Sequence, residues 1–127
     1  MSEAYSDVVL RHFRDPCNVG ILKNPDGVGR VENPASGASI ELYLRIDDHK
    51  VVQARFKSQG CTATIAASSV LTTMVAGRSI GEVGRISRGD IEQALGGLPP
   101  TKKHAAALAE DAIQAAISDF RKAATPS

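Results

Sequence analysis

Two adjoining segments of the chain alternate hydrophobic and polar residues with the period of two that is typical of β-strands. They cover residues 39–47 and 51–58, and the polar residues 47–50 join them. This pattern predicts an antiparallel hairpin with one buried face. The positions predicted to face the core are Ile40, Leu42, Leu44 and Ile46 in the first strand and Val52, Ala54 and Phe56 in the second. A short third strand is expected at residues 29–32, within a segment rich in Gly, Pro and Asn.

Hydrophobic residues recur at spacings of three and four in much of the remaining chain, which indicates helices. The helices are expected at residues 6–14, 62–76, 80–85, 90–95 and 102–122. Val9 and Phe13 form the apolar side of the first helix, which ends before Pro16 because the residue preceding a proline avoids the helical conformation. Gly77 is suited to cap the end of the second helix.

Strands followed by helices predict an α+β domain, because the helices have to cover the hydrophobic face of the hairpin. The expected fold is a three-stranded antiparallel sheet with helices packed on one face and a long C-terminal helix. A length of 127 residues favours a single domain, residues 1–127, with frayed ends at residues 1–5 and 123–127.

The composition narrows the classes of function. The chain has 15 Lys and Arg residues against 14 Asp and Glu residues, a balance that argues against a dedicated nucleic-acid or membrane-surface binder. No hydrophobic run is long enough to span a bilayer, and the acidic N-terminus lacks the hydrophobic region of a signal peptide. We therefore expect a cytoplasmic protein whose two cysteines do not form a structural disulfide.

Cys61 is the residue that points most clearly to chemistry. It follows Gly60 at the junction between the second predicted strand and the helix of residues 62–76. A thiol at the start of a helix lies near the positive end of the helix dipole, which favours the reactive thiolate. The plain alternative is a small buried residue without chemistry, since free cysteines are often buried.

Five short segments resemble, in order and spacing, the U-type iron–sulfur cluster scaffold family, the IscU and NifU N-terminal type. They are residues 15–20 (DPCNVG), 33–38 (NPASGA), 60–63 (GCTA), 98–105 (LPPTKKHA) and 108–113 (LAEDAI). The resemblance covers nearly the whole chain, from Tyr5 to about Arg121. The LPPTK segment is more similar to the IscU branch than to the SufU branch.

The resemblance implies a scaffold for iron–sulfur cluster assembly rather than an enzyme. In this family, three cysteines with an aspartate and a histidine hold a nascent [2Fe–2S] cluster or zinc, and a cysteine desulfurase supplies sulfur as a persulfide. A dedicated Hsp70-type chaperone recognises a segment that corresponds here to Leu98, Pro99, Pro100, Thr101 and Lys102. The same residues also fit a simple stop and start between two helices.

The chain departs from the family at most of the implied ligand positions. Ser36 and Ala38 stand where the family has its first cysteine and its aspartate, and Ala105 stands where it has its third cysteine. Cys61 and His104 remain, although a histidine at that place also fits a solvated or capping residue. Two ligands are too few for one chain, because clusters normally take four thiolates, with two histidines replacing two of them in some centres, and zinc takes four ligands.

Three sources would supply the missing ligands. A homodimer would bring together two copies of Cys61 and of His104, the ligand types of a Rieske centre. Cys17 would add a thiolate if the segment after Pro16 folded toward Cys61, although the family usually has a basic residue there. Ser36 is a weaker candidate, because a serine hydroxyl is rarely ionised and a small residue suits a tight loop. Iron, zinc and the absence of any metal all remain open.

Four functions fit these residues to different degrees. The first is a divergent cluster scaffold or carrier that uses Cys61 and His104, and the second is a persulfide sulfur acceptor at Cys61, which requires one nucleophilic thiol and no ligand set. The third is a non-catalytic adaptor that binds a cysteine desulfurase or an Hsp70-type chaperone. A thiol enzyme ranks last, because Ala38 replaces the carboxylate that would orient His104.

Overall fold

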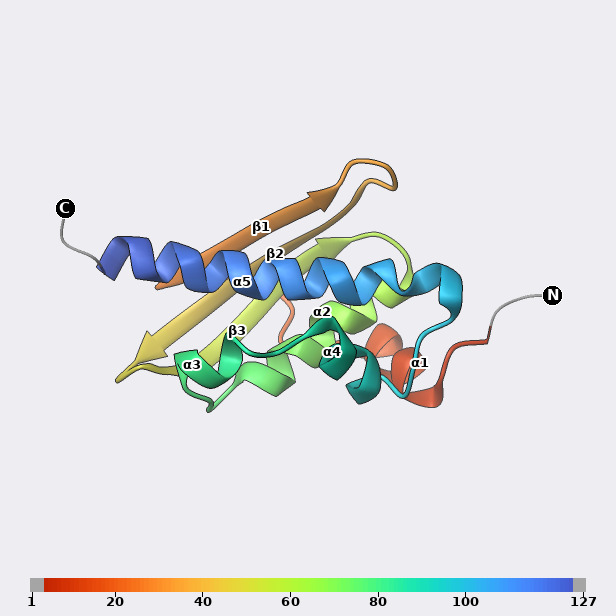
Figure 1. Cartoon of the computed structure of the whole chain (residues 1–127), viewed down its shortest axis with the longest axis horizontal. Coiled ribbons are helices and arrows are strands. Elements are labelled where there is room, and N and C mark those ends of the chain that lie inside the picture. The colour runs from red at the N-terminus through yellow and green to blue at the C-terminus, as the bar shows by residue number, and fades with distance from the viewer. Residues whose placement is uncertain (1–3, 125–127) are drawn as a thin grey trace.

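The fold is a three-stranded sheet covered by helices on one face (Figure 1). The structure, a computed structural model, describes residues 4–124. The strands are antiparallel in the order β1 (Gly27–Asn33), β2 (Ala38–Asp47) and β3 (Lys50–Gln59). The helices are α1 (Asp7–Arg14), α2 (Thr62–Val75), α3 (Ile80–Val83), α4 (Arg88–Ala94) and α5 (His104–Ala124), with a 3₁₀ turn, η1 (Pro100–Lys102), before α5. The predicted α+β fold with a long C-terminal helix is therefore confirmed.

The ends of α5 differ from the prediction. The helix was expected to begin at Lys102, but the 3₁₀ turn η1 comes first and α5 begins at His104. It continues to Ala124, two residues beyond the predicted end at Lys122. The fraying predicted for residues 1–3 and 125–127 lies outside the described residues.

The hairpin contains a β-bulge that changes which residues of β3 face the core. Arg45 pairs with Gln53, but Ile46 pairs with Val51, so Val52 is the extra residue between two regular pairs. Val51 is consequently fully buried, whereas Val52 is 51% exposed. The prediction that Val52 faces the core is wrong, because a bulge shifts the alternation by one position.

Helix α2 lies at the centre of the core and contacts α1, α4, α5 and β3. Its buried side chains are mainly Ala, Ser, Thr and Val, so neighbouring elements can approach it on several sides. On the sheet, Ile40, Leu42 and Leu44 are fully buried, as predicted. Phe13 is an exception on α1, since it is 40% exposed although Val9, one turn before it, is fully buried.

Helix α5 crosses β1 at very short range, and two glycines make this approach feasible. A Cβ atom added at Gly29 would lie 2.2 Å from the backbone oxygen of Ala112, and one at Gly27 would lie 2.5 Å from that of Ala116. These distances are shorter than any normal contact between carbon and oxygen atoms, so a side chain at either position would displace the backbone of α5 or β1. The glycines, which suggested a loop, are therefore the residues that let α5 pack directly on β1 while β1 pairs with β2.

Polar side chains fix α1 and the following segment to the middle of α2. The Nδ1 atom of His12 lies 2.7 Å from the hydroxyl of Ser69, and the backbone N–H of Cys17 donates to the same hydroxyl at 2.8 Å. Burial, together with the neighbouring positive charge of Arg11, lowers the pKa of His12 below its usual value. The folded state therefore favours neutral His12.

We predict that this histidine makes the fold less stable in mild acid. Because the pKa of His12 is lower in the folded state, the unfolded chain binds more protons once the pH falls below its ordinary value of about 6.5. Stability from this group is complete above that pH and is lost as the pH falls toward the folded-state pKa. Urea unfolding between pH 8 and pH 5 should show a smaller decrease for His12→Gln than for the parent, and identical profiles would contradict the assignment.

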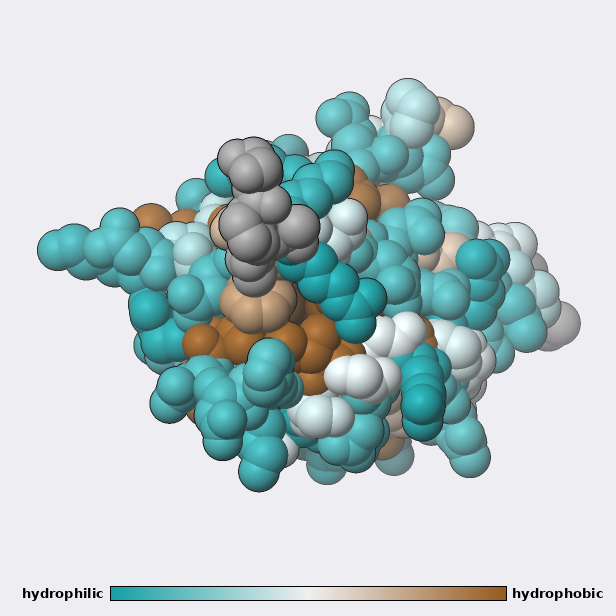
Figure 2. Space-filling view, turned by 60° about the vertical axis from the view of Figure 1, so that its left-hand side comes forward, coloured by the Kyte–Doolittle hydropathy of each residue, from teal (hydrophilic) through white to brown (hydrophobic). Residues whose placement is uncertain are grey.

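Hydrophilic residues dominate the end of the molecule that carries the β2–β3 turn and the C-terminal end of α5. Figure 2 shows this face as mostly polar, with a smaller hydrophobic area near its centre. Among the described residues, no helix is both long and apolar enough to cross a membrane.

Candidate functional site

Cys61 is the residue at which β3 gives way to α2, as the sequence suggested. It occupies the N-cap position with an extended backbone (φ −77°, ψ 175°), and its side chain is partly exposed. Gly60 has a φ of +145°, a conformation that favours glycine, and it turns the chain from the strand into the helix. The thiol is therefore held at the start of a buried helix and remains accessible from solvent.

The surroundings of Cys61 favour its thiolate. Burial raises the pKa of the thiol, but the hydroxyl of Thr64, the backbone N–H groups of Thr64 and Ala63 and the charge of Lys102 outweigh it, so the pKa is lowered. The sulfur lies 3.5 Å from the Thr64 hydroxyl. A lowered pKa increases the fraction of thiolate at neutral pH, and the thiolate is the nucleophilic form.

Three segments that are far apart in the sequence meet around Cys61. A Cβ atom at Gly60 would lie 3.1 Å from the Ala38 side chain, so the start of β2 contacts the end of β3. Lys102 of η1 is close enough to act on the sulfur. Figure 1 shows the β1–β2 turn, the end of β3 and the start of α5 at the same end of the molecule. Three of the five segments that carry the family resemblance, residues 33–38, 60–63 and 98–105, thus lie at one end of the molecule.

His104 is the first residue of α5 and is partly exposed. It lines a hollow with Asn33 at the end of β1, with Pro34 of the β1–β2 turn and with the acidic residues Glu32 and Asp111. This hollow joins the start of α5 to the segment that contains Ser36. His104 is therefore at the same end of the molecule as Cys61 (Figure 1).

The described residues at this end do not complete a metal site within one chain. Ser36 uses its hydroxyl to accept the backbone N–H of Ala38 at 3.2 Å, which closes the β1–β2 turn, and Ala105 is fully buried. Among residues 4–124, no group of three or more His, Cys, Asp and Glu side chains is arranged to hold a metal ion. The donor set of one chain therefore does not fit a cluster or a tetrahedral zinc ion.

Cys17 lies elsewhere. Both cysteines are free, and the backbone of Cys17 is hydrogen-bonded to Ser69, eight residues after Cys61 along α2. Eight residues of helix span about 12 Å. The segment after Pro16 is therefore fixed to the middle of α2 and does not fold toward Cys61, which removes the predicted route to a second thiolate within one chain.

The predicted chaperone segment is only partly at the surface. Leu98 and Pro99 are buried, whereas Pro100 and Thr101 are exposed and Lys102 is partly exposed. Its Pro99 backbone oxygen accepts the N–H of Lys102 at 2.8 Å, which forms the 3₁₀ turn. The segment thus leads into α5 and carries Lys102, whose charge lowers the pKa of Cys61.

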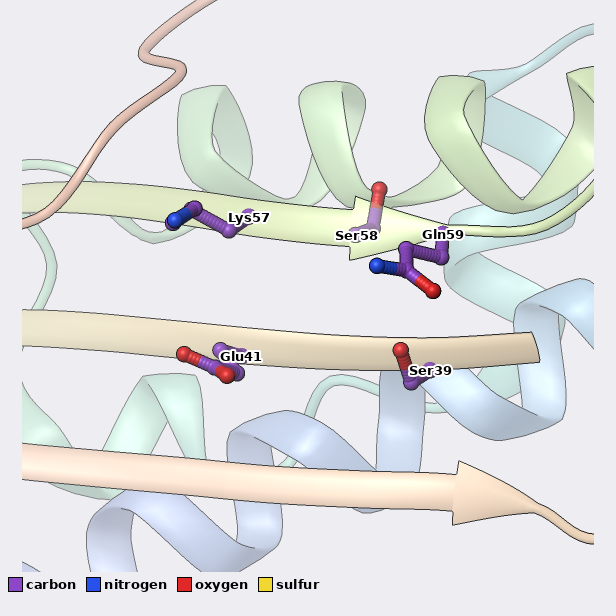
Figure 3. A pocket seen from close by; sticks show the side chains of 5 residues that line it. All are labelled: Ser39, Glu41, Lys57, Ser58 and Gln59. Carbon is purple, nitrogen blue, oxygen red and sulfur yellow. The ribbon is translucent and has the colours of Figure 1, made fainter. Parts of the chain in front are cut away.

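A second hollow lies across β2 and β3 and contains no thiol or histidine. Its lining residues are Ser39, Glu41, Lys57, Ser58 and Gln59 (Figure 3). Glu41 and Lys57 are cross-strand partners of opposite charge, which suits a solvated sheet surface. The lining of this hollow therefore includes none of the predicted site residues.

Two residues that lower the pKa of Cys61, Thr64 and Lys102, were not identified from the sequence. Thr64 lies three positions after Cys61, a spacing that places two residues on the same side of a helix, so it was accessible to prediction. Lys102 was noted only as part of the proline segment, and nothing in the local pattern relates it to a residue 41 positions earlier.

The fold and the converging segments define the class of U-type iron–sulfur assembly domains. Residues 4–126 match the family described as the NifU-like N terminal domain, and the chain belongs to this family. It is 44% identical over 119 residues to the iron–sulfur cluster assembly scaffold protein IscU 1 of Archaeoglobus fulgidus, covering 93% of this chain and 78% of the relative. It is 43% identical over 122 residues to the scaffold protein IscU of Haemophilus influenzae, covering 93% and 96%.

A solved structure agrees on the fold. The N-terminal part of a nitrogen-fixing NifU-like protein from Brucella abortus superimposes with a TM-score of 0.78 at 20% identity, over 94% of this chain and 95% of that one.

Proposed function

We propose that this chain acts in iron–sulfur cluster assembly and that Cys61 is its reactive thiol, which accepts sulfur from the persulfide of a cysteine desulfurase. The observation that carries the proposal is the thiolate-favouring position of Cys61 in a site that lacks the other ligands. Sulfur acceptance requires one accessible nucleophile, whereas cluster binding requires several ligands. The relatives, which are named as scaffold proteins, support the pathway.

The proposed reaction is a transfer of sulfane sulfur between two thiols. The Cys61 thiolate attacks the outer sulfur of the donor persulfide, R–S–SH, and forms a new sulfur–sulfur bond. The sulfur–sulfur bond of the donor breaks, R–S⁻ leaves with the electron pair, and the proton stays on the transferred sulfur. No oxidant is needed, because the oxidation state of the transferred sulfur is unchanged. The sulfur remains on Cys61 until it is passed on, so the chain acts as a carrier rather than an enzyme.

The test is incubation with an active cysteine desulfurase and L-cysteine, followed by mass spectrometry of the intact protein and its peptides. We expect one sulfur atom added to the Cys61 peptide, complete loss of the adduct in Cys61→Ser, and an unchanged adduct in Cys17→Ser. A parent chain that stays unmodified beside the active desulfurase would overturn the proposal. If the parent accepts no sulfur and Cys61→Ala binds the desulfurase or a chaperone as well as the parent does, the chain is an adaptor.

A second candidate function is a cluster shared between two copies of the chain. It is favoured by the position of His104, which is partly exposed at the same end of the molecule as Cys61. Two chains would offer two thiolates and two imidazoles to a [2Fe–2S] cluster or to a zinc ion.

We also propose a limited contact with an Hsp70-type chaperone. Because Leu98 and Pro99 are buried, a chaperone that meets the folded chain would contact Pro100, Thr101 and Lys102. Lys102 also acts on Cys61, so such a contact would alter the charge near the sulfur.

A further inference from the structure

The hydroxyl of Thr64 is a buried polar group directed at the sulfur of Cys61. The two atoms are 3.5 Å apart, within hydrogen-bond range for sulfur, and Thr64 is fully buried. The backbone N–H of Thr64 donates to the carbonyl of Cys61 at 3.0 Å, so the two residues are linked by their main chains as well. This contact is therefore part of the first turn of α2.

Three other hydroxyl groups of α2 bind backbone carbonyls instead. Ser68 donates to the carbonyl of Thr64 at 2.9 Å, and Thr72 and Thr73 donate to the carbonyls of Ser69 and Val70, each at 2.7 Å. These are the usual bonds of Ser and Thr to the preceding helical turn. Thr64 is the third residue of the helix, where the preceding turn has not yet formed, and its hydroxyl partner is the sulfur.

Gly60 leaves the room that the Thr64 hydroxyl occupies. A Cβ atom at Gly60 would lie 2.8 Å from the Thr64 hydroxyl oxygen and 3.0 Å from its Cβ. Because Gly60 has no side chain, the buried hydroxyl of Thr64 fits between the end of β3 and the Cys61 sulfur. Hydrogen bonds to a charged acceptor such as a thiolate are stronger than those between neutral groups.

We propose that Thr64 is a positioning residue that donates its O–H to the Cys61 sulfur and so prepares it both to accept and to release sulfur. The inference rests on the proposed role of Cys61 as the sulfur acceptor. In the first step the bond stabilises the attacking thiolate. In release, an acceptor thiolate attacks the outer sulfur, the sulfur–sulfur bond breaks, and Cys61 leaves as the thiolate that Thr64 again stabilises.

The test is the pH profile of Cys61 alkylation by iodoacetamide in a Cys17→Ser background, where one thiol is left to react. Thr64→Val keeps the shape of the side chain and removes the donor. We expect its profile to move to higher pH and its rate at pH 7 to fall by roughly fivefold, the change that corresponds to a hydrogen bond of ordinary net strength. Thr64→Ser restores the donor and should restore the profile.

Thr73→Val is the matched control, because it removes a hydroxyl of the same helix that is bonded to a backbone carbonyl. A Thr64→Val profile that coincides with that of the parent, or an equal shift in Thr73→Val, would overturn the inference, provided that thermal unfolding shows both variants to be folded.

Alkylation needs no sulfur donor, so this result is independent of the proposed function. A shifted Thr64→Val profile supports the positioning role even if the parent accepts no sulfur from the desulfurase. Conversely, sulfur transfer to the parent together with an unshifted profile would overturn the role of Thr64 alone.

Discussion

Replacing Gly29 by alanine is expected to destabilise the fold by about 3 kcal/mol, an effect at the upper end of ordinary overpacking. The added methyl group would meet the backbone oxygen of Ala112 at 2.2 Å and the backbone nitrogen of Ala116 at 2.7 Å. Backbone atoms of a long helix cannot rotate away as a side chain can, so α5 has to move off β1. For a domain of this size the melting temperature should fall on the order of 10 °C.

Gly81→Ala is the control for this substitution. A Cβ atom at Gly81, in the short helix α3, would meet only the Ser79 hydroxyl, at 4.0 Å. Alanine is the better helix former, so this variant should be as stable as the parent or slightly more stable. Differential scanning calorimetry measures both. If Gly29→Ala melted at the temperature of the parent, the close approach of α5 to β1 would not exist in solution.

The sequence predicted the order of helices and strands, because the spacing of hydrophobic residues reflects which face of each element is buried. It was insufficient where a distant element decides the local structure. Val51 and Val52 are both β-branched and apolar, and only the pairing with β2 determines which of them is buried. Likewise, the Gly27–Asn33 strand extends two residues before the predicted start, because α5 packs directly on the two glycines that suggested a loop.

The candidate site also has features that the sequence predicts and features that it does not. The losses at Ser36, Ala38 and Ala105 are visible in the sequence once the family pattern is applied, and the structure adds that Ser36 closes a turn and that Ala105 is buried. The effect of the Lys102 charge on the pKa of Cys61 depends on the approach of two segments that are distant in the sequence. No local pattern in a single sequence predicts that approach.

Restoring the missing ligands should convert the site into one that holds a cluster on a single chain. The variant combines Ser36→Cys, Ala38→Asp and Ala105→Cys, and with Cys61 it offers three thiolates and a carboxylate beside His104. After anaerobic reconstitution with iron, sulfide and reductant, we expect about two irons per chain and strong visible absorbance. The parent should bind at most about two irons per two chains, and Cys61→Ser should bind none.

Two features of the structure sharpen this experiment. Ala38 and Ala105 are buried, so the metal-free variant should unfold more easily than the parent, because a buried carboxylate without a partner is costly. Iron binding should recover that stability, because a ligand that binds only the folded state stabilises it. Adding Cys61→Ser to the triple variant is the control for adventitious iron. A folded triple variant that stays colourless would show that the three segments do not converge, whereas a parent with about two irons per chain would show that its site is already complete.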